Sequence, residues 1–344
     1  MKIVLHSPAF YPMIGGLEAF AAMLAGGLQA RGHEVVVLCE SELEPGVAEP
    51  FSFRVVRRAS FFEKAYWLGR ADAVVHAQIS LKGLRPWLLT RKPLLVSHQT
   101  WLRETDGAAM TWPTRLKRFA CRFARNVTCS AAIGHDLGLA HEVIPNPYDD
   151  FLFRLRPEVP RDRDLLFVGR LVSDKGVDLL LQALALLPGR RLTITGDGPE
   201  AAALPWRAEE WKVASRVTFT GPKRGEELAR LMNAHRVLVV PSRWAEPFGI
   251  VALEGAASGC TVVASDGGGL PDAVGPCGSV FASGDAAALA RVIETLPLPE
   301  PAAVAAHLAR HRASAVVAAY EAELRDLASR IKQVNAPRVG STTA

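Results

Sequence analysis

The sequence predicts an α/β protein of two domains, each with a doubly wound parallel sheet, that is, a sheet covered by helices on both faces. Its 344 residues suit two domains of ordinary size. Short apolar runs of strand length alternate with longer segments of helical pattern, which is typical of parallel sheets buried on both faces. The alternation breaks off in a segment rich in proline and charge, at residues 145–164, and then restarts.

The first domain is predicted over residues 1–147. A buried strand at 3–6 is followed by a loop and by a helix at 17–31, which Gly32 ends. The later strands of this domain are expected at 35–39, 74–76, 94–97, 127–129 and 143–144. Residues 148–163 are interpreted as a linker, because they combine prolines with many charges.

The second domain is predicted over residues 164–312. A last long helix is expected at 313–333, and the small, polar residues 334–344 are predicted to form a flexible tail. Parallel sheets bind ligands at the carboxyl ends of their strands, so we expect the site there, in a cleft between the two domains. The strands of the second domain are expected at 165–169, 192–195, 217–220, 237–240, 261–264 and 279–281.

The composition argues against several classes of protein. Hydrophobic residues make up 49% and charged residues 22%, and the net charge of +5 comes without the dense basic stripe of a nucleic-acid binder. Five cysteines without a C-x-x-C pair predict buried thiols in a cytoplasmic protein, and no zinc site. The apolar run before His6 is too short for a signal peptide, and no run approaches the roughly eighteen apolar residues of a membrane span.

The most informative stretch is PSRWAEPFGIVALE, residues 241–254, which places Glu246 and Glu254 eight positions apart between a strand and a helix. Backbone N–H groups and the positive end of a helix dipole converge at such a junction and favour an anion such as a diphosphate. Carboxylates beside it can accept hydrogen bonds from sugar hydroxyls. The stretch therefore suits a ligand that is both sugar and diphosphate. The alternative is a solvated loop glutamate and a helix-surface glutamate that share no ligand.

Two further segments follow strands of the second domain. In FVGRLVSDKG, residues 167–176, Arg170 and Lys175 can stabilise charge on a departing diphosphate, or else they are ordinary surface cations. In TGDGPEA, Gly196 and Gly198 form a G-x-G-x-x-A match to a dinucleotide fingerprint. A proline interrupts the helix that follows, so a nicotinamide-dependent dehydrogenase is only a distant alternative.

Together these segments resemble glycosyltransferase family 4, a family of retaining enzymes. Residues 246–254 match its E-x7-E signature, residues 167–176 its F-x-G-R-L-x-x-x-K-G motif, and residues 15–18 its G-G-x-E loop. Residues 267–272 resemble its G-G-x-P-E stretch, with Asp272 where glutamate is usual, and their three glycines would let the backbone approach a ligand. The resemblance covers nearly the whole chain. It implies a GT-B fold, two Rossmann-like domains facing a cleft, with the last helix packed back on the first domain.

The resemblance also implies how the donor is held. Glu246 would bind hydroxyls of the donor sugar and Glu254 those of the ribose. Arg170 and Lys175 would bind the diphosphate in place of a metal ion, so no metal or other cofactor is expected. The other implied donor-binding residues are Gly15, Gly16, Gly196, Gly198, Phe248, Gly249 and Ile250.

On the first domain, the resemblance makes His98 the histidine that contacts the donor sugar, although the two residues after it depart from the family pattern. It places Gly16 and Glu18 on the acceptor side; alternatively, Glu18 is simply an acidic residue in a first helical turn. The predicted catalytic residues are therefore His98, Arg170, Lys175 and Glu246.

The implied reaction moves a sugar from a nucleoside-diphosphate sugar to an acceptor hydroxyl with retention of configuration. A UDP-sugar is the first choice of donor and GDP-mannose the second. The acceptor is expected to be a saccharide, a lipid-linked saccharide or a small molecule. Two alternatives are a nucleotide-sugar epimerase of the same architecture and a non-catalytic subunit that only binds sugar or nucleotide.

One further segment concerns partners. Residues 114–125 carry four arginines at helical spacing, with leucine and phenylalanine on another face. Such a basic amphipathic helix suits an anionic membrane surface or a phospholipid-linked acceptor, which would make the protein peripheral at the inner face of the membrane. The alternative is a solvated arginine face on a helix packed against the core. The four residues are Arg115, Arg118, Arg122 and Arg125.

Overall fold

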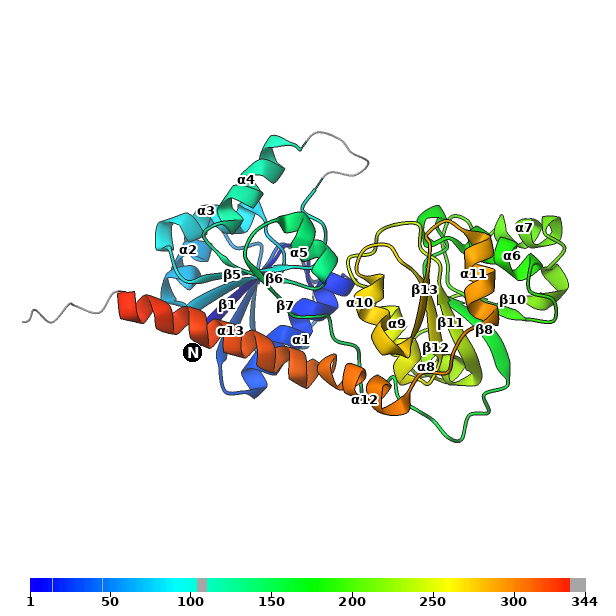
Figure 1. Cartoon of the computed structure of the whole chain (residues 1–344). Coiled ribbons are helices and arrows are strands. Elements are labelled where there is room, and N and C mark those ends of the chain that lie inside the picture. Colours follow the sequence, from blue (N-terminus) through cyan, green and yellow to red (C-terminus); the bar gives the residue numbers. More distant parts are fainter. Residues whose placement is uncertain (14, 45, 104–109, 335–344) are drawn as a thin grey trace, which may run out of the picture. The chain divides into compact units, whose positions relative to one another are not determined.

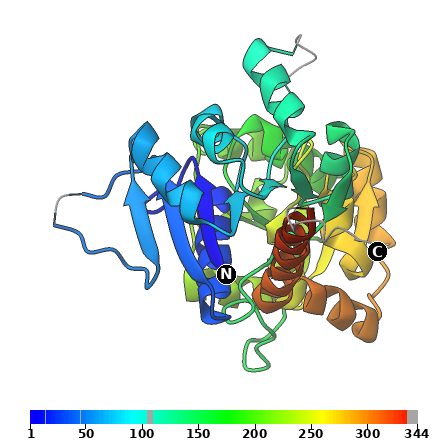
Figure 2. The same cartoon turned by 90° about the vertical axis from the view of Figure 1, so that its left-hand side faces the viewer.

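The computed structural model describes residues 1–334 except 14, 45 and 104–109. The chain divides into two compact units, which are described separately below (Figures 1 and 2). Unit 1 comprises Met1–Cys129, Ile133–Ile144 and the chain from Val316 onward. Unit 2 comprises Ser130–Ala132 and Pro145–Ala315. The chain thus returns to unit 1 after completing unit 2.

Unit 1 contains a parallel sheet of seven strands in the order β3-β2-β1-β4-β5-β6-β7. The order reverses between β1 and β4, where Leu5 pairs with Val75, and such a switch point opens a crevice at the carboxyl ends of the strands. The strands are β1 (Lys2–Ser7), β2 (Glu34–Cys39), β3 (Arg54–Arg57), β4 (Ala73–His76), β5 (Leu94–His98), β6 (Arg125–Thr128) and β7 (His141–Val143).

Alternating residues of the strands enter two cores, one on each face of the sheet. Ile3 and Leu5 of β1 pack with α1 (Gly16–Ala30) and α13 (Ala313–Val334), whereas Val4 belongs to the core on the other face. That second core includes residues of α2 (Phe61–Arg70), α3 (Leu81–Thr90), α4 (Trp112–Cys121) and α5 (Ala131–Leu137).

The last helix, α13, is part of the core of unit 1. Tyr320 is completely buried, and its hydroxyl lies 2.7 Å from Ser97 Oγ at the end of β5. Glu321 is paired with Arg31 and His33, which follow α1. A Cβ at Gly27 of α1 would overlap the side chain of Val317, so the glycine lets the two helices approach closely.

Unit 2 contains a parallel sheet of six strands in the order β10-β9-β8-β11-β12-β13. The strands are β8 (Arg163–Val168), β9 (Leu192–Thr195), β10 (Val217–Phe219), β11 (His235–Val240), β12 (Thr261–Ser265) and β13 (Gly278–Phe281). The α-helices are α6 (Val177–Ala185), α7 (Leu204–Glu210), α8 (Gly225–Ala234), α9 (Ile250–Ala257), α10 (Leu270–Val274), α11 (Ala286–Glu294) and α12 (Pro301–Arg310). Short 3-10 turns occur at Ser173–Lys175, Ala214–Arg216 and Gly275–Cys277.

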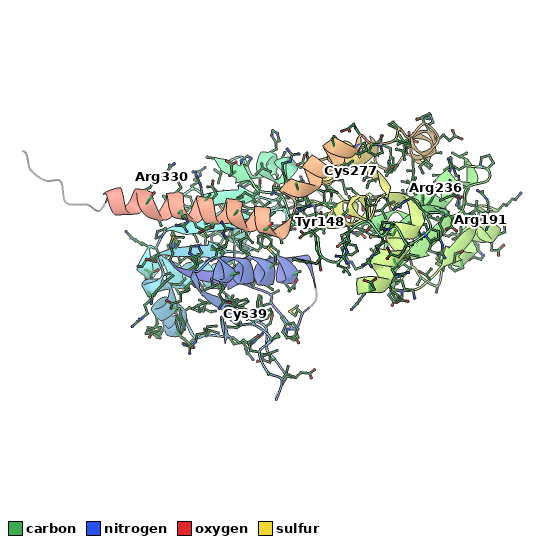
Figure 3. All side chains as sticks on the ribbon, turned by 90° about the horizontal axis from the view of Figure 1, so that it is seen from below. Cys39, Tyr148, Arg191, Arg236, Cys277 and Arg330 are labelled. Carbon is green, nitrogen blue, oxygen red and sulfur yellow. The ribbon has the colours of Figure 1, made fainter. Side chains whose placement is uncertain are left out.

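The predicted fold class, two doubly wound parallel sheets, is confirmed. All five cysteines are buried thiols, as predicted, and Cys39 and Cys277 are labelled in Figure 3. Strand β3 was not predicted, because it has only two apolar residues between two arginines. No helix in the described part of the chain is long and apolar enough to cross a membrane.

The helix predicted over residues 114–125 is wrong at its end. Helix α4 ends at Cys121, and Arg125 begins strand β6. The guanidinium of Arg125 pairs with Glu323 and Asp326 of α13. The guanidinium of Arg118 donates to the carbonyls of Asp136 and Leu137 at the end of α5, both at 2.8 Å. Arg118 and Arg125 therefore serve the fold of unit 1, which leaves Arg115 and Arg122 as exposed cations.

Candidate functional site

The loop between β11 and α9 carries Glu246, and the structure brings it to Lys175. The Lys175 ammonium, at the end of the turn Ser173–Lys175, forms an ion pair with Glu246 Oε1. Ser242 Oγ donates to the same oxygen at 2.8 Å. The Lys175 and Glu246 side chains keep 22% and 14% of their surface exposed, so the pair stands at the edge of the protein with room for a ligand.

Ser242 was not predicted as a site residue. Its backbone oxygen accepts hydrogen bonds from Ser265 Oγ at 2.7 Å and from Ser283 Oγ at 3.3 Å. Ser265 is the last residue of β12 and Ser283 follows β13, so the ends of these two strands contact the start of the Glu246 loop, which follows β11. The only sequence signal for Ser242 is its place four residues before Glu246.

The glycines at 267–269 support the Glu246 loop from behind. The Gly269 N–H donates to the Glu246 carbonyl at 2.7 Å. A Cβ at Gly268 would overlap that same carbonyl oxygen, and a Cβ at Gly269 would overlap the carbonyl of Pro247. The close backbone approach expected at these glycines therefore exists, and its described partner is the Glu246 loop itself. Asp272 accepts a hydrogen bond from the Ala131 N–H at 2.7 Å.

Gly196 and Gly198 support the Arg170 segment in the same way. A Cβ at Gly196 would overlap the carbonyl of Gly169, and a Cβ at Gly198 would crowd the backbone of Leu171. The Leu171 N–H donates to the Asp197 carbonyl at 2.8 Å. Packing between two loops thus accounts for both glycines without a dinucleotide.

Arg170 itself is exposed, and its guanidinium makes no hydrogen bond or ion pair with any described residue. It follows the carboxyl end of β8, as predicted. An arginine whose backbone is fixed on both sides and whose five N–H donors are unused is well placed to bind an oxyanion.

Phe248, Gly249 and Ile250 form the entry to α9. The Phe248 ring is 2% exposed and stacks on His311, with the ring centroids 5.8 Å apart. Gly249 caps the helix with φ of +113°, in the left-handed region, and a Cβ there would meet Leu270. Phe248 anchors this turn through its side chain, so its backbone N–H is the group left to contact a ligand.

Glu254 lies on α9, and its environment differs from that of Glu246. Its carboxylate is partly buried and has no hydrogen-bond or ion-pair partner among the described residues. Burial and, to a lesser extent, the nearby charge of Asp149 together raise the pKa of Glu254 to about 7. A carboxyl without a partner among the described residues can accept hydrogen bonds from hydroxyl donors.

His98 is the last residue of β5 in unit 1 and is completely buried. Its Nε2 lies 3.0 Å from Asn126 Oδ1, while the Asn126 amide donates to the Cys121 carbonyl at 2.9 Å. The amide is thereby oriented with its oxygen toward the imidazole, so Nε2 carries the proton and Nδ1 is an acceptor. Nδ1 has no partner among the described residues, and burial lowers the pKa of His98 to about 4.

Gly15, Gly16 and Glu18 lie at the start of α1. Gly15 is extended, and a Cβ there would press on the carboxylate of Glu18, which folds back over it. Gly16 begins the helix and faces open space. Glu18 is in the first turn, where a negative charge is favourable, and its side chain makes no hydrogen bond with a described residue. Both the functional and the plain helical interpretation of Glu18 remain compatible with this geometry.

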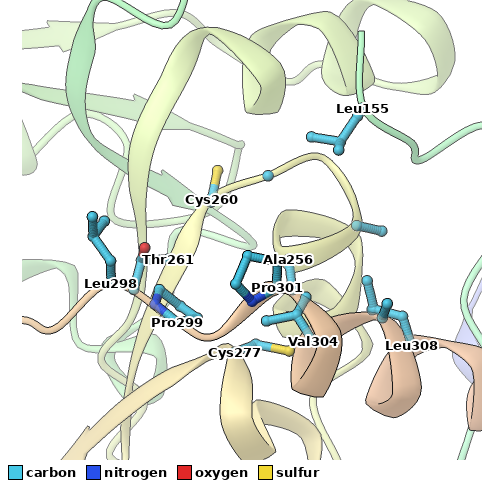
Figure 4. A pocket seen from close by; sticks show the side chains of 13 residues that line it. Leu155, Ala256, Cys260, Thr261, Cys277, Leu298, Pro299, Pro301, Val304 and Leu308 are labelled. Carbon is cyan, nitrogen blue, oxygen red and sulfur yellow. The ribbon is translucent and has the colours of Figure 1, made fainter.

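Two hollows of unit 2 lie at the amino ends of the strands, opposite the ends that carry the Glu246 loop. One, of about 410 Å³, is lined by Cys260, Thr261, Cys277 and residues of α12 (Figure 4), at the amino ends of β12 and β13. The other is lined by Asp162 and Asp164, which form an Asp-x-Asp pair in the sequence. This pair lies at the amino end of β8, whereas Arg170 follows its carboxyl end, so it is not part of the Glu246 site.

Comparisons with known proteins agree with these motifs. A family model described as Glycosyltransferase Family 4 matches residues 14–150, and one described as Glycosyl transferases group 1 matches residues 162–297. The glycogen synthase of Mycobacterium tuberculosis (strain CDC 1551 / Oshkosh) is 31% identical over 367 residues, which cover 88% of this chain and 87% of that protein.

Two solved structures share the fold over almost the whole chain. Sucrose-phosphate synthase from Thermosynechococcus elongatus matches with a TM-score of 0.68 at 23% identity, covering 97% of this chain and 98% of that one. Anabaena HepE, solved in complex with UDP and glucose, matches with a TM-score of 0.68 at 20% identity, covering 97% and 99%. With two parallel α/β units and these matches, the chain has the GT-B fold and belongs to glycosyltransferase family 4.

Proposed function

We propose that this glycosyltransferase is a retaining, metal-independent enzyme that uses a UDP-sugar, with GDP-mannose as the second choice of donor. The observation that carries the proposal is the arrangement of Lys175, Glu246 and the unpaired Arg170 at the carboxyl ends of β8 and β11. It combines two cations for a diphosphate with one fixed carboxylate for a sugar.

The two cations would take the role of a metal ion at the leaving group. Cleavage of the bond between sugar and diphosphate leaves negative charge on a phosphate oxygen. Arg170 can bind that oxygen with two parallel N–H groups. Lys175 has three N–H donors, so it can keep its bond to Glu246 and still donate to the phosphate.

Glu246 would orient the donor sugar. Its carboxylate is held by Lys175 and Ser242, so sugar hydroxyls that donate to it meet an acceptor already in place. A carboxylate engaged in this way is poorly suited to attack the anomeric carbon. We therefore infer that the acceptor attacks on the face from which the diphosphate departs, with a phosphate oxygen accepting the proton of the acceptor hydroxyl.

Two observations support the donor. Anabaena HepE, which shares the fold, was solved with UDP and glucose. The partly buried Glu254 has no partner among the described residues and could accept hydrogen bonds from the two ribose hydroxyls of a uridine nucleotide. As acceptor we propose a saccharide hydroxyl, free or lipid-linked, with a small molecule as the other possibility.

The proposal is tested by proton NMR of the product formed from UDP-α-glucose, UDP-α-galactose or GDP-α-mannose with a panel of saccharide acceptors, with and without EDTA. We expect the α anomer, read from the H1–H2 coupling of a glucosyl or galactosyl product and from the one-bond C1–H1 coupling of a mannosyl product, at an unchanged rate in EDTA. An inverted anomer contradicts retention, loss of turnover in EDTA contradicts metal independence, and absence of transfer with every pair favours a non-catalytic subunit.

A further inference from the structure

Helix α4 of unit 1 turns its apolar side away from the core. Only Cys121 among its residues is buried. Trp112, Leu116, Phe119 and the following Phe123 recur at helical spacing and are 69%, 39%, 54% and 66% exposed. The apolar stripe of a surface helix normally packs on its own domain. Here four large apolar side chains remain uncovered on one stripe.

The stripe and helix α3 together form an apolar hollow. Its volume is about 240 Å³, and its lining includes Leu84, Trp87 and Leu88 of α3 opposite Leu116 and Phe119 of α4. Leu88 is itself 60% exposed at the rim. Figure 1 shows α3 and α4 as neighbours, with α4 projecting from the rest of unit 1. An uncovered apolar patch of this kind marks a surface for another molecule.

The charges that helices α3 and α4 themselves carry are all positive, although Glu40 pairs with Lys82 of α3 and Asp136 with Arg118 of α4. Residues 77–103 and 110–135, which contain both helices and their flanking loops, include no aspartate or glutamate. Two acids, Glu104 and Asp106, lie between them in the sequence and outside the described residues. Six cations in or directly after α3 and α4, of which Arg85 lines the hollow, make no ion pair with any described residue: Arg85, Arg91, Lys92, Arg115, Lys117 and Arg122.

We propose that this α3–α4 surface, defined by Leu88, Trp112, Leu116, Phe119, Phe123 and the six cations, docks on a bilayer that contains anionic phospholipid. The apolar stripe would enter the interface between headgroups and acyl chains, and the hollow would accept an acyl chain. The unpaired cations would contact the phosphates. The aromatic side chains suit this depth, because their rings are favourable at the boundary between hydrocarbon and water.

A soluble protein partner fits these observations less well. A protein interface of this apolar character is normally depleted of charge at its core and completed by a partner with matching acids. The combination of uncovered aromatics, aliphatic side chains and unpaired cations is instead that of a helix lying in a membrane interface. The surface corrects the expectation from sequence: Arg118 and Arg125 are engaged in the fold, and α3 supplies half of the apolar face.

The test is flotation of the full chain, without donor or acceptor, with vesicles of phosphatidylcholine alone or with about one third phosphatidylglycerol. We expect flotation with the anionic vesicles only. The triple variant R85Q/R115Q/R122Q should bind on the order of a hundredfold more weakly, at about one factor of five per cation. A matched control removes three exposed cations of unit 2, R154Q/K212Q/R291Q, and should bind like the wild type.

Penetration of the bilayer is tested separately. Phosphatidylglycerol with brominated acyl chains should quench Trp112 fluorescence, and W112F should lose most of that quenching. The pair F119S/F123S should reduce binding at least tenfold, whereas F151S/W206S, exposed aromatics of unit 2, should not.

Several results would overturn the proposal. They are equal binding to neutral and anionic vesicles, wild-type binding by R85Q/R115Q/R122Q, and no difference in quenching between wild type and W112F. Binding only to vesicles that carry a lipid-linked saccharide, or self-association that F119S/F123S abolishes without vesicle binding by the wild type, would assign the surface to another occupant. None of these readouts uses turnover, so they are independent of the proposed donor and mechanism.

Discussion

The loop that carries Glu246 and the helix that carries Glu254 belong to one sequence motif, yet they place their carboxylates in opposite environments. Glu246 is paired with Lys175 and accepts a hydrogen bond from Ser242 at 2.8 Å. Glu254 has no partner among the described residues, and burial raises its pKa to about 7. Two glutamates at a fixed spacing can therefore do different work. The first is a carboxylate already held by protein groups, whereas under the proposed function the second would receive its donors from the ligand.

The largest effect should come from Glu246→Ala. Removal of the fixed carboxylate takes away the group that orients the sugar and the counter-charge of Lys175, so we expect kcat to fall on the order of a thousandfold. Glu254→Ala should mainly raise KM for the donor, by about tenfold, because it removes a hydrogen bond to a part of the donor that does not react. Steady-state kinetics with circular dichroism checks both. Equal losses of kcat in the two variants would contradict the separation of roles.

A smaller effect, of about a hundredfold in kcat/KM, should follow from Gly268→Ala. Gly268 has φ of +64°, and a Cβ there would overlap the Glu246 carbonyl, so the substitution must move the loop that holds the site. Gly189→Ala is the matched control, since Gly189 also has positive φ, at +84°, but faces open space. It should cost about 1 kcal/mol of stability and no activity. Similar activity losses in both variants would show that loop support is not the cause.

The supports of the Glu246 site could be predicted only in part from the sequence. The motifs at residues 167–176, 196–201 and 267–272 were all identified, because each follows a strand that the apolar pattern reveals. The packing of these motifs against one another could not be predicted. The close approach of Gly268 to the Glu246 carbonyl, for example, joins two loops that follow different strands. The hydrogen bond from Ser242 carries no pattern of its own.

The roles of several side chains of unit 1 could not be predicted from the sequence, because they depend on partners far along the chain. The arginines at 118 and 125 look alike in the sequence, at helical spacing with Arg115 and Arg122. Their roles are set by acids and carbonyls far along the chain, such as Glu323 for Arg125. His98 was correctly placed at the end of a strand, but its burial and its bond to Asn126 depend on the neighbouring strand β6. Its role in the reaction stays a prediction.

The smallest effect concerns the pH dependence that Glu254 creates. Its pKa is raised in the folded protein from an ordinary 4.5 to about 7, so the folded state favours the protonated form. The contribution of this raised pKa to the free energy of unfolding is fully present below about pH 4.5 and is lost as the pH rises through 7. The Glu254→Gln variant has no carboxyl at this position, so it does not lose this stability. Its free energy of unfolding should therefore rise relative to that of the wild type by about 2 kcal/mol between pH 5 and pH 8. Urea denaturation at the two pH values measures this difference.

The same titration should appear in donor binding. Ribose hydroxyls donate best to the ionised carboxylate, so wild-type affinity for UDP should rise several-fold from pH 6 to pH 8. Glu254→Gln should show a flat profile over this range. A wild-type profile as flat as that of the variant would remove Glu254 from the nucleotide site.

The central claim is that Arg170 and Lys175 form a binding site for a nucleoside diphosphate. It is tested most directly by calorimetric titration of UDP, GDP, uridine and NAD into the wild type and into R170A/K175A. We predict that UDP or GDP binds the wild type, that the double variant loses on the order of a hundredfold in that affinity, and that weak uridine binding is unchanged. Equal losses for nucleoside and nucleoside diphosphate, or binding of NAD alone, would contradict the claim.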